Sequence, residues 1–387
     1  MTTDFGVIVA GAGPAGVAAA CLFAGQGRSV ALLAPPEVAG HDPRTVALMQ
    51  PQIHLLGEIG VWPGDLQVHA QALRRLRMVD DTGATFRAPT VTFDPTEIGE
   101  AEFGWNVPLA VLVPALAARA EAVGVTRRAA EVKTARVTGD GIEITTDGAS
   151  YNAKLAVAAD GRKSPLREAA GIVWQHWAYE QSALATSFAH SGSHDGISTE
   201  YHRGAGPCTT VPLPGNRSAL VWLERPARIE ALMAMSDAAL AAEIQIATHG
   251  DLGLVSGSGP RRAFAMEGLT ARSYAAARTI LAGETAHVFP PLGAQGLNLS
   301  LRDAAEAARI TAGAADPGSA HLLREYDGAR RRDIGPRQTI IHMMNRSLLT
   351  GFTPLEAGRA GALLALSSVA FLRRAAMRQG LGTPRQA

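Results

Sequence analysis

The chain has 387 residues, which at roughly 150 residues per domain is enough for two to three folding units. Apolar residues make up 47% of the chain and charged residues 18%, so an intrinsically disordered protein and a fibrous rod are both excluded. The 36 basic and 35 acidic residues nearly cancel, and no nucleic-acid partner is therefore expected for the chain as a whole.

The first elements in chain order predict a βαβ unit. Residues 5–10 form a continuous apolar run, which is typical of a strand covered on both faces. Residues 14–26 are small and apolar, like a helix that packs closely on that strand, and residues 29–33 indicate the next strand. Residues 45–60 are expected to be helical. The N-terminus lacks the basic start and the cleavage site of a signal peptide, so we expect a cytoplasmic protein.

From about residue 66 the pattern changes to that of an antiparallel sheet. Residues 66–94 consist of short alternating stretches interrupted by Asp80-Asp81-Thr82-Gly83, which is a hairpin signal. A helical pattern returns at residues 109–123. Residues 129–158 then predict a three-stranded meander, and residues 173–224 are again strand-like.

The C-terminal half is mainly helical in pattern, with one expected strand at residues 278–282. The expected helices cover residues 226–234, residues 237–248, the stretch that ends near residue 313, and residues 319–380 with a break near 351–354. The whole pattern predicts an α/β nucleotide-binding domain that is interrupted by an antiparallel sheet and followed by a helical tail.

A glycine-rich turn directly follows the first strand and opens the first helix. It reads Gly11-Ala12-Gly13-Pro14-Ala15-Gly16. In such a turn the first glycine permits a tight bend, the second lets a pyrophosphate approach the backbone, and the third lets helix and strand touch. Free N–H groups and the positive end of the helix then hold the phosphates. The placement between strand and helix predicts dinucleotide binding.

The second strand lacks the acidic residue that usually holds the adenosine ribose in such a site. Ala34 stands at the expected position. Glu37 and Asp42 are the nearby alternatives, and the prolines at 35 and 36 leave open whether either acid reaches the ribose.

Two later motifs repeat the order of strand, glycine turn and helix. An apolar strand ends in Asp160-Gly161 before a helix that Ser164 is expected to cap, although an Asp-Gly pair also occurs in ordinary turns. Another strand ends at Gly283-Glu284, and the glycine loop of residues 290–296 opens a helix at about Leu297. There the acid can accept hydrogen bonds from hydroxyl groups, and the start of the helix can stabilise negative charge.

In this order and at these spacings the three motifs resemble the flavin-dependent aromatic monooxygenases, and most closely the branch that hydroxylates the ring during ubiquinone biosynthesis. The same branch is indicated by Asp42-Pro43-Arg44-Thr45-Val46-Ala47-Leu48, by the Pro-Leu-Gly-Ala-Gln-Gly-Leu-Asn-Leu run of residues 291–299, by Leu301-Arg302-Asp303 and by residues 371–382. The resemblance covers essentially the whole chain. It implies a Rossmann-like FAD-binding domain interleaved with an antiparallel-sheet substrate domain, plus C-terminal helices. We expect the FAD-binding domain at residues 1–65, 96–171 and 275–318, the substrate domain at 66–95 and 172–274, and the helical region at 319–387.

The resemblance also implies cofactor contacts, residue by residue. The turn of Gly11, Ala12, Gly13, Pro14, Ala15 and Gly16 would bind the FAD diphosphate. Arg44 would contact the phosphates and the region near the isoalloxazine, Val132 would bracket the adenine, and Asp160 and Gly161 would lie near the cofactor. Glu284 replaces the family's aspartate and is one methylene longer, and Gly293-Ala294 replaces the more usual Ala-Gly order. The residues expected to line the flavin ring are Pro291, Gly293, Gly296, Leu297 and Asn298, with Pro291 and Gln295 closest to the chemistry.

The activity that follows from the resemblance is hydroxylation of a polyprenylated phenol. NAD(P)H would act as a transient reductant of FAD, and O2 would then give a flavin hydroperoxide that attacks the ring. No metal is expected, because the eleven histidines show no regular ligand spacing. Two alternatives remain open: the same chemistry on a soluble aromatic, and a non-catalytic FAD-binding member of a biosynthetic assembly.

Three further features keep two interpretations each. His287 could relay a proton or make a structural hydrogen bond, and the structural role is favoured. Tyr201 and His202 lie on the expected substrate sheet, where they could contact the phenol, although strand residues of this kind more often face solvent or the core. The tail joins an apolar stretch to Arg373, Arg374 and Arg378, which suits either contact with the inner face of a bacterial membrane or packing on the protein itself. The apolar residues of this tail are Leu363, Leu364, Ala365, Leu366, Val369, Phe371 and Leu372.

Overall fold

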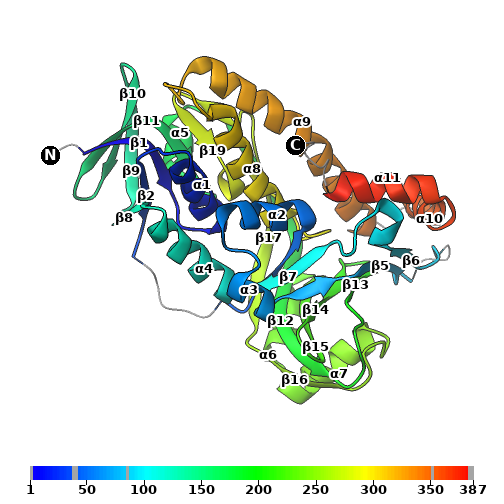
Figure 1. The fold of residues 1–387 in the computed structure, drawn as a ribbon. Helices are drawn as coiled ribbons and strands as arrows, with labels where there is room; N and C mark the ends of the chain where they lie inside the picture. The colour runs from blue at the N-terminus through cyan, green and yellow to red at the C-terminus, as the bar shows by residue number, and fades with distance from the viewer. Residues whose placement is uncertain (1–2, 37–41, 84–86, 350–352, 382–387) are drawn as a thin grey trace.

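The computed structural model describes residues 3–36, 42–83, 87–349 and 353–381 (Figure 1). Within these residues the chain forms three β-sheets with helices packed around them. The helices are α1 (Pro14–Gly25), α2 (Gln50–Ile59), α3 (Gly64–His69), α4 (Leu109–Ala122), α5 (Pro165–Ala169), α6 (Pro226–Ala234), α7 (Asp237–Ala247), α8 (Gln295–Thr311), α9 (Ala320–Leu349), α10 (Thr353–Ser368) and α11 (Ala370–Leu381).

The first sheet is built on parallel strands, and its carboxyl ends meet at one edge. Its strands lie in the order β18 (Ala275–Ala276), β19 (Thr279–Leu281), β11 (Ser150–Ala158), β1 (Thr3–Ala10), β2 (Val30–Ala34) and β8 (Thr126–Ala129). Ala10 pairs with Ala158, and Ala158 pairs with Leu281, so the turns that follow these strands leave the sheet side by side. This edge is where an open α/β sheet binds its ligands.

The expected meander extends this sheet. The strands β9 (Val132–Thr138) and β10 (Gly141–Thr146) pair antiparallel with each other, and β10 pairs antiparallel with β11. Gly139 and Asp140 separate β9 from β10, and Asp147 and Gly148 lie between β10 and β11, so the three-stranded meander expected for residues 129–158 is confirmed.

The second sheet shares no strand with the first, and the helices α6 and α7 pack on one of its faces. Its strands follow the order β20 (His287–Val288), β17 (Arg262–Ala271), β12 (Trp174–His190), β15 (Arg217–Glu224), β14 (Cys208–Leu213), β13 (Ile197–His202), β5 (Arg75–Asp80) and β6 (Val91–Phe93), with β16 (Val255–Ser258) paired to β12. Leu184, Leu220 and Trp222 point from one face into an apolar cluster with Ile229 of α6 and Ile244 of α7. The opposite face of this sheet carries Phe264, which Arg44 contacts.

A small third sheet connects the two larger ones. It consists of β3 (Thr45–Met49), β7 (Gly104–Pro108) and β4 (Gln71–Leu73). The helix predicted for residues 45–60 is therefore wrong in its first five residues, because 45–49 pair with β7 and only 50–59 are helical. The pairing requires glycine at 104: its φ is +156°, and a Cβ there would lie 1.9 Å from the carbonyl oxygen of Leu48.

The α/β class, the inserted antiparallel sheet and the C-terminal helices are confirmed (Figure 1). The hairpin expected between 66 and 94 is confirmed only in part, because β5 pairs antiparallel with β6 but β4 belongs to the third sheet. The helix α8 begins at Gln295, two residues before the expected start. Of the break expected at 351–354, residues 351 and 352 lie outside the described residues, whereas Thr353 and Pro354 already belong to α10. The domain boundaries stay a prediction.

Candidate functional site

The three glycine motifs come together at the carboxyl edge of the first sheet. A Cβ built on Gly11 would lie 2.1 Å from the carbonyl oxygen of Ala159 and 2.9 Å from the nitrogen of Asp160. A Cβ on Gly283 would be 3.6 Å from the Cβ of Ala15. The first turn therefore touches the second and the third, although more than 260 residues of sequence separate the first from the third.

The first turn forms a backbone cradle. Gly13 is the N-cap of α1 and offers no side chain to the free N–H groups there. Around the position of a Cβ on Gly13, no heavy atom lies within 4 Å, whereas a Cβ on Gly16 would lie 2.0 Å from the carbonyl oxygen of Gly11. The turn is thus closed toward the strand at Gly16 and open in front of Gly13, which is the shape that a phosphate approaching a helix start requires.

The second and third motifs are joined by Thr285, which follows Glu284 in the short helix η2 (Gly283–Thr285). Its hydroxyl donates to Oδ1 of Asp160 at 3.3 Å and accepts a hydrogen bond from the nitrogen of Gly161 at 3.1 Å. Burial raises the pKa of Asp160, and hydrogen bonds from Ser164 and Thr285 only partly oppose this effect. The other oxygen of Asp160, Oδ2, is buried and has no partner among the described residues.

These observations fit a bound dinucleotide. The cradle at residues 11–16 exposes backbone N–H groups, and the unpaired Oδ2 of Asp160 can accept a hydrogen bond from a ligand. The start of α8 is a second open helix end, because its N-cap Ala294 lies in the left-handed region (φ +54°) and makes no side-chain cap. Ser164 caps the helix after Asp160-Gly161 by accepting from the nitrogen of Arg167, as predicted.

Of the two acids that could replace the missing one at Ala34, the structure describes Asp42, and its carboxylate is engaged by Arg44. Asp42 is bound to Arg44, with 2.6 Å between Oδ2 and Nη2, and the hydrogen bonds from Arg44 hold the pKa of Asp42 below its usual range. Arg44 also lies over the ring of Phe264, 5.2 Å from its centroid. The carbonyl of Ala34 accepts a hydrogen bond from the nitrogen of Ala130, two residues before Val132. Glu37 lies outside the described residues.

Glu284 is exposed at the rim of this site. Its Oε2 lies 3.5 Å from Nε of Arg162, which also pairs with Glu267 of β17. Arg162 therefore ties the third motif to the second sheet. The longer side chain of Glu284 remains free to move, because an exposed ion pair of this kind holds it weakly.

The loop before α8 is held from below by Asn298. Its Oδ1 accepts from the nitrogen of Met49 at 2.8 Å, and its Nδ2 donates to the carbonyl oxygens of Ala47 and Ala294. The amide of Asn298, which was expected to line the flavin ring, is thus engaged by backbone of β3 and of its own loop. Pro291, Gly293 and Gly296 are exposed, and Leu297 is half-buried. Oε1 of Gln295 accepts a hydrogen bond from Nη1 of Arg337 at 3.2 Å.

Behind the loop lies a buried charge cluster that the sequence analysis did not identify. Asp303 accepts hydrogen bonds from the nitrogen of Gly283 and from Nε of Arg330, and it lies 2.7 Å from Nε2 of His287. Burial alone would raise the pKa of Asp303, but Arg330 and His287 hold it below its usual range. His287 is buried and stacks on Phe289. Its hydrogen bond to Asp303 is the kind of bond that the favoured structural role requires. A signal was present in Leu301-Arg302-Asp303, but no sequence rule pairs it with Arg330.

Tyr201 and His202 point to opposite faces of the second sheet. Tyr201 packs in the cluster with α6 and α7, and its hydroxyl bonds Asp251 at 2.9 Å. His202 is buried on the other face, where Nε2 lies 2.6 Å from Glu200 Oε1. Its Nδ1 has no partner among the described residues.

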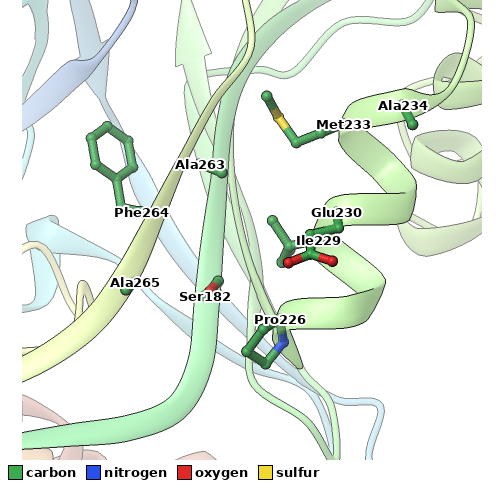
Figure 2. Close-up of a pocket in the computed structure, with 9 residues that line it drawn as sticks. All are labelled: Ser182, Pro226, Ile229, Glu230, Met233, Ala234, Ala263, Phe264 and Ala265. Atoms are coloured by element: carbon green, nitrogen blue, oxygen red, sulfur yellow. The ribbon is translucent and has the colours of Figure 1, made fainter.

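A groove of about 470 Å³ lies between α6 and the strands β12 and β17, away from the three motifs (Figure 2). Its lining includes Ile229 and Met233 of α6 and Ala263 of β17. Figure 2 shows the ring of Phe264 on the side of β17 turned away from α6, and this ring is the one that Arg44 contacts. The face of β17 that carries the Phe264 ring, and that Arg44 contacts, is therefore the face turned away from α6.

Comparison with known proteins adds the family context. A family model described as "FAD binding domain" matches residues 4–337. A ubiquinone hydroxylase of Rhodospirillum rubrum is 32% identical, with 97% of this chain and 89% of the relative covered. A 3-demethoxyubiquinol 3-hydroxylase of Escherichia coli is 29% identical, with 97% and 98% covered. The structure of a p-nitrophenol 4-monooxygenase from Pseudomonas putida superposes with a TM-score of 0.78 at 19% identity, covering 99% of this chain and all of that one, which shows a shared fold.

Proposed function

The chain belongs to the FAD-binding domain family and is an FAD-dependent aromatic-ring hydroxylase, and on that premise we propose that it hydroxylates the ring of a polyprenylated phenol in ubiquinone biosynthesis. The proposed balance is one ring C–H bond, O2, NAD(P)H and a proton giving a ring hydroxyl, water and NAD(P)⁺. The observation that carries the proposal is the 32% identity to a ubiquinone hydroxylase over nearly the whole of both chains.

The proposed cofactor contacts follow the geometry of the three motifs. Backbone N–H groups in the first turn of α1 after Pro14, which has none itself, would hold the diphosphate, and Asp160 would accept a hydrogen bond through its unpaired Oδ2. Glu284 is the proposed acceptor for ribityl hydroxyls. Bound FAD supplies the redox chemistry, reduction by NAD(P)H and activation of O2. The remaining proposed contacts are Arg44 at the phosphates, Val132 at the adenine, and Pro291, Gly293, Gly296, Leu297 and Asn298 beside the ring.

The chain's own residues would orient the substrate and exclude water. On the face of the second sheet that carries Phe264, the strands β12 and β15 present small or apolar side chains: Ala183 pairs with both Phe264 and Leu223, and Ala185 pairs with Val221. The neighbour of Phe264 along β17 on this face is Arg262, which lies over the Phe264 ring. Ala183, Ala185 and Leu223 are buried. The apolar part of this surface suits an aromatic ring, the two arginines over Phe264 bring positive charge to its edge, and the open start of α8 favours negative charge beside the ring.

The first test is spectroscopic. The purified protein should be yellow, and NAD(P)H should bleach its flavin absorbance more rapidly when a prenylated phenol is present. Mass spectrometry should then find a product heavier by one oxygen atom, with the label taken from ¹⁸O2. A protein that cannot be loaded with FAD would contradict the enzymatic activity.

A second test addresses the substrate. Deletion of the gene should stop quinone production and lead to accumulation of an under-hydroxylated precursor. Unchanged quinone production together with turnover of a soluble phenol would replace the proposed substrate by a soluble aromatic. FAD binding without turnover of either substrate would favour a non-catalytic member of a biosynthetic assembly.

A further inference from the structure

The C-terminal helices form a bent pair at one end of the molecule. Residues 360–368 of α10 and α11 meet at an angle of 105° (Figure 1). Among the described residues, no single helix has the length and apolar composition needed to cross a membrane, and only this bent pair meets both criteria when its halves are taken together. The bend is called the knee below, and it comprises residues 360–381.

The inner side of the knee is bound to the protein. Leu363, Met377 and Leu381 are buried in an apolar cluster with Met49 of β3 and with Ala294 of the loop before α8. Arg373 pairs with Glu97 at 2.9 Å. Because both helices are fastened along this inner side, the knee lies along the surface of the protein and its outer side alone is available to a partner.

The outer side of the knee is apolar. Large apolar side chains concentrate at the bend, where the exposed fractions are 53% for Leu364, 43% for Val369, 71% for Phe371 and 41% for Leu372. An exposed cluster of this kind is unfavourable in water and marks an interaction surface.

The charge of the knee identifies the partner. Residues 360–381 contain three arginines and no acidic residue, although the whole chain has a net charge of only +1. Arg373 is engaged by Glu97, whereas Arg374 and Arg378 are exposed. Exposed aromatic and aliphatic side chains next to exposed arginines match the interface of an anionic bilayer, where the apolar groups enter the acyl boundary and the guanidinium groups meet the phosphates.

We propose that the knee docks this protein on an anionic lipid bilayer, with Phe371 and Leu372 inserted and Arg374 and Arg378 on the headgroups. Docking itself does not depend on the proposed function; only its benefit, access to a prenylated substrate, rests on that function. In the docked position one helix, about 10 Å across, would separate the bilayer from the cluster that contains Ala294. A prenylated substrate dissolved in the bilayer would thus lie close to the loop before α8.

Vesicle co-sedimentation of the full-length protein tests the proposal without any turnover. Wild-type protein should sediment with vesicles of an equal mixture of phosphatidylglycerol and phosphatidylcholine, and much less with phosphatidylcholine alone. Arg374→Gln with Arg378→Gln should lower the partition coefficient on the anionic vesicles about 30-fold. Phe371→Ser with Leu372→Ser should lower it by at least about tenfold on both kinds of vesicle.

A matched control separates the knee from general surface hydrophobicity. Ile246→Ser with Leu254→Ser removes two side chains that are 70% and 69% exposed near α7 and β16, at a different end of the molecule (Figure 1). This variant should sediment like wild type, and all variants should keep the wild-type melting temperature. Equal sedimentation of wild type and the Phe371/Leu372 variant would overturn the proposal. The proposal would also be overturned if the wild-type protein were a dimer that does not bind vesicles and the Phe371/Leu372 variant were a monomer. The knee would then bind a second copy of the chain.

Discussion

Gly13 and Gly16 lie in the same turn but face different surroundings. A Cβ at 16 would collide with the carbonyl of Gly11 at 2.0 Å, while a Cβ at 13 would meet no heavy atom within 4 Å. Gly13 also has φ −68°, which any residue can adopt. Gly13 therefore leaves room for a ligand, whereas Gly16 is required by the fold itself.

We expect Gly16→Ala to destabilise the apoprotein, because the obstructing atom is backbone and cannot move aside. Overpacking of this kind costs about 1–3 kcal/mol. Gly13→Ala is the matched control: its apoprotein should unfold within about 0.5 kcal/mol of wild type, while its affinity for FAD falls. Urea unfolding of the apoproteins and titration with FAD measure the two effects. A Gly13→Ala variant with lower apoprotein stability and unchanged FAD affinity would contradict this division.

Asp303 sets a second prediction at the residue scale. Asp303→Asn leaves Arg330 buried with its main counter-charge removed, and the loss should be about 3–5 kcal/mol in the free energy of unfolding at pH 7. Asp316→Asn is the control. Asp316 also pairs with an arginine, Arg278, but is 40% exposed, so its loss should stay below about 1 kcal/mol.

The pH dependence of this cluster has a definite sign. The folded-state pKa of Asp303 is lowered, so its contribution is present in full above the unfolded pKa of about 3.9 and is lost as the pH falls through the folded value. The stability difference between wild type and Asp303→Asn should therefore be constant from pH 7 to about pH 5 and shrink in more acidic solution. Urea unfolding at several pH values measures it, and a difference that grows on acidification would be the wrong sign.

At the scale of elements, the sequence predicted those whose signal is local. The βαβ unit, the meander and the helices α6 and α7 are encoded by apolar periodicity and by glycine turns within each segment. The strand β3 was missed because an apolar run of five residues suits a helix as well as a strand, and its partner β7 lies more than fifty residues away. The pairing of Asp303 with Arg330 was missed for the same reason: it depends on how α8 packs on α9.

Arg337 connects three elements and gives a prediction at this scale. From α9 it reaches Gln295 at the start of α8, and it donates to the carbonyl oxygens of Gln379 and Gly380 at the end of α11. Arg337→Ala should speed hydrogen exchange both in α11 and in the first turn of α8. Arg332→Ala, an exposed arginine on the same helix, is the control and should leave both unchanged. Faster exchange in α11 alone would show that the loop before α8 does not depend on this link.

At the scale of the whole molecule, the candidate site exists only because distant segments share one sheet edge. Each motif follows a strand, and the sequence could therefore place residues 11–16, 160–161 and 283–284 at carboxyl ends. What it could not supply is the strand order, in which β19, β11 and β1 are direct neighbours. The partners that join the motifs, such as Thr285 and Asp160, come from that order.

This arrangement predicts how the cofactor stabilises the molecule. A dinucleotide that spans the starts of α1 and α8 binds segments almost 300 residues apart, whereas ADP can occupy only the adenine and diphosphate part. FAD at 100 times its Kd should add about 2.7 kcal/mol to the free energy of unfolding. Hydrogen exchange should slow at both helix starts with FAD, but only around residues 11–16 with ADP. Equal protection of both helix starts by ADP would mean that the loop before α8 responds to the diphosphate site through the protein and not through contact with the flavin half of the cofactor.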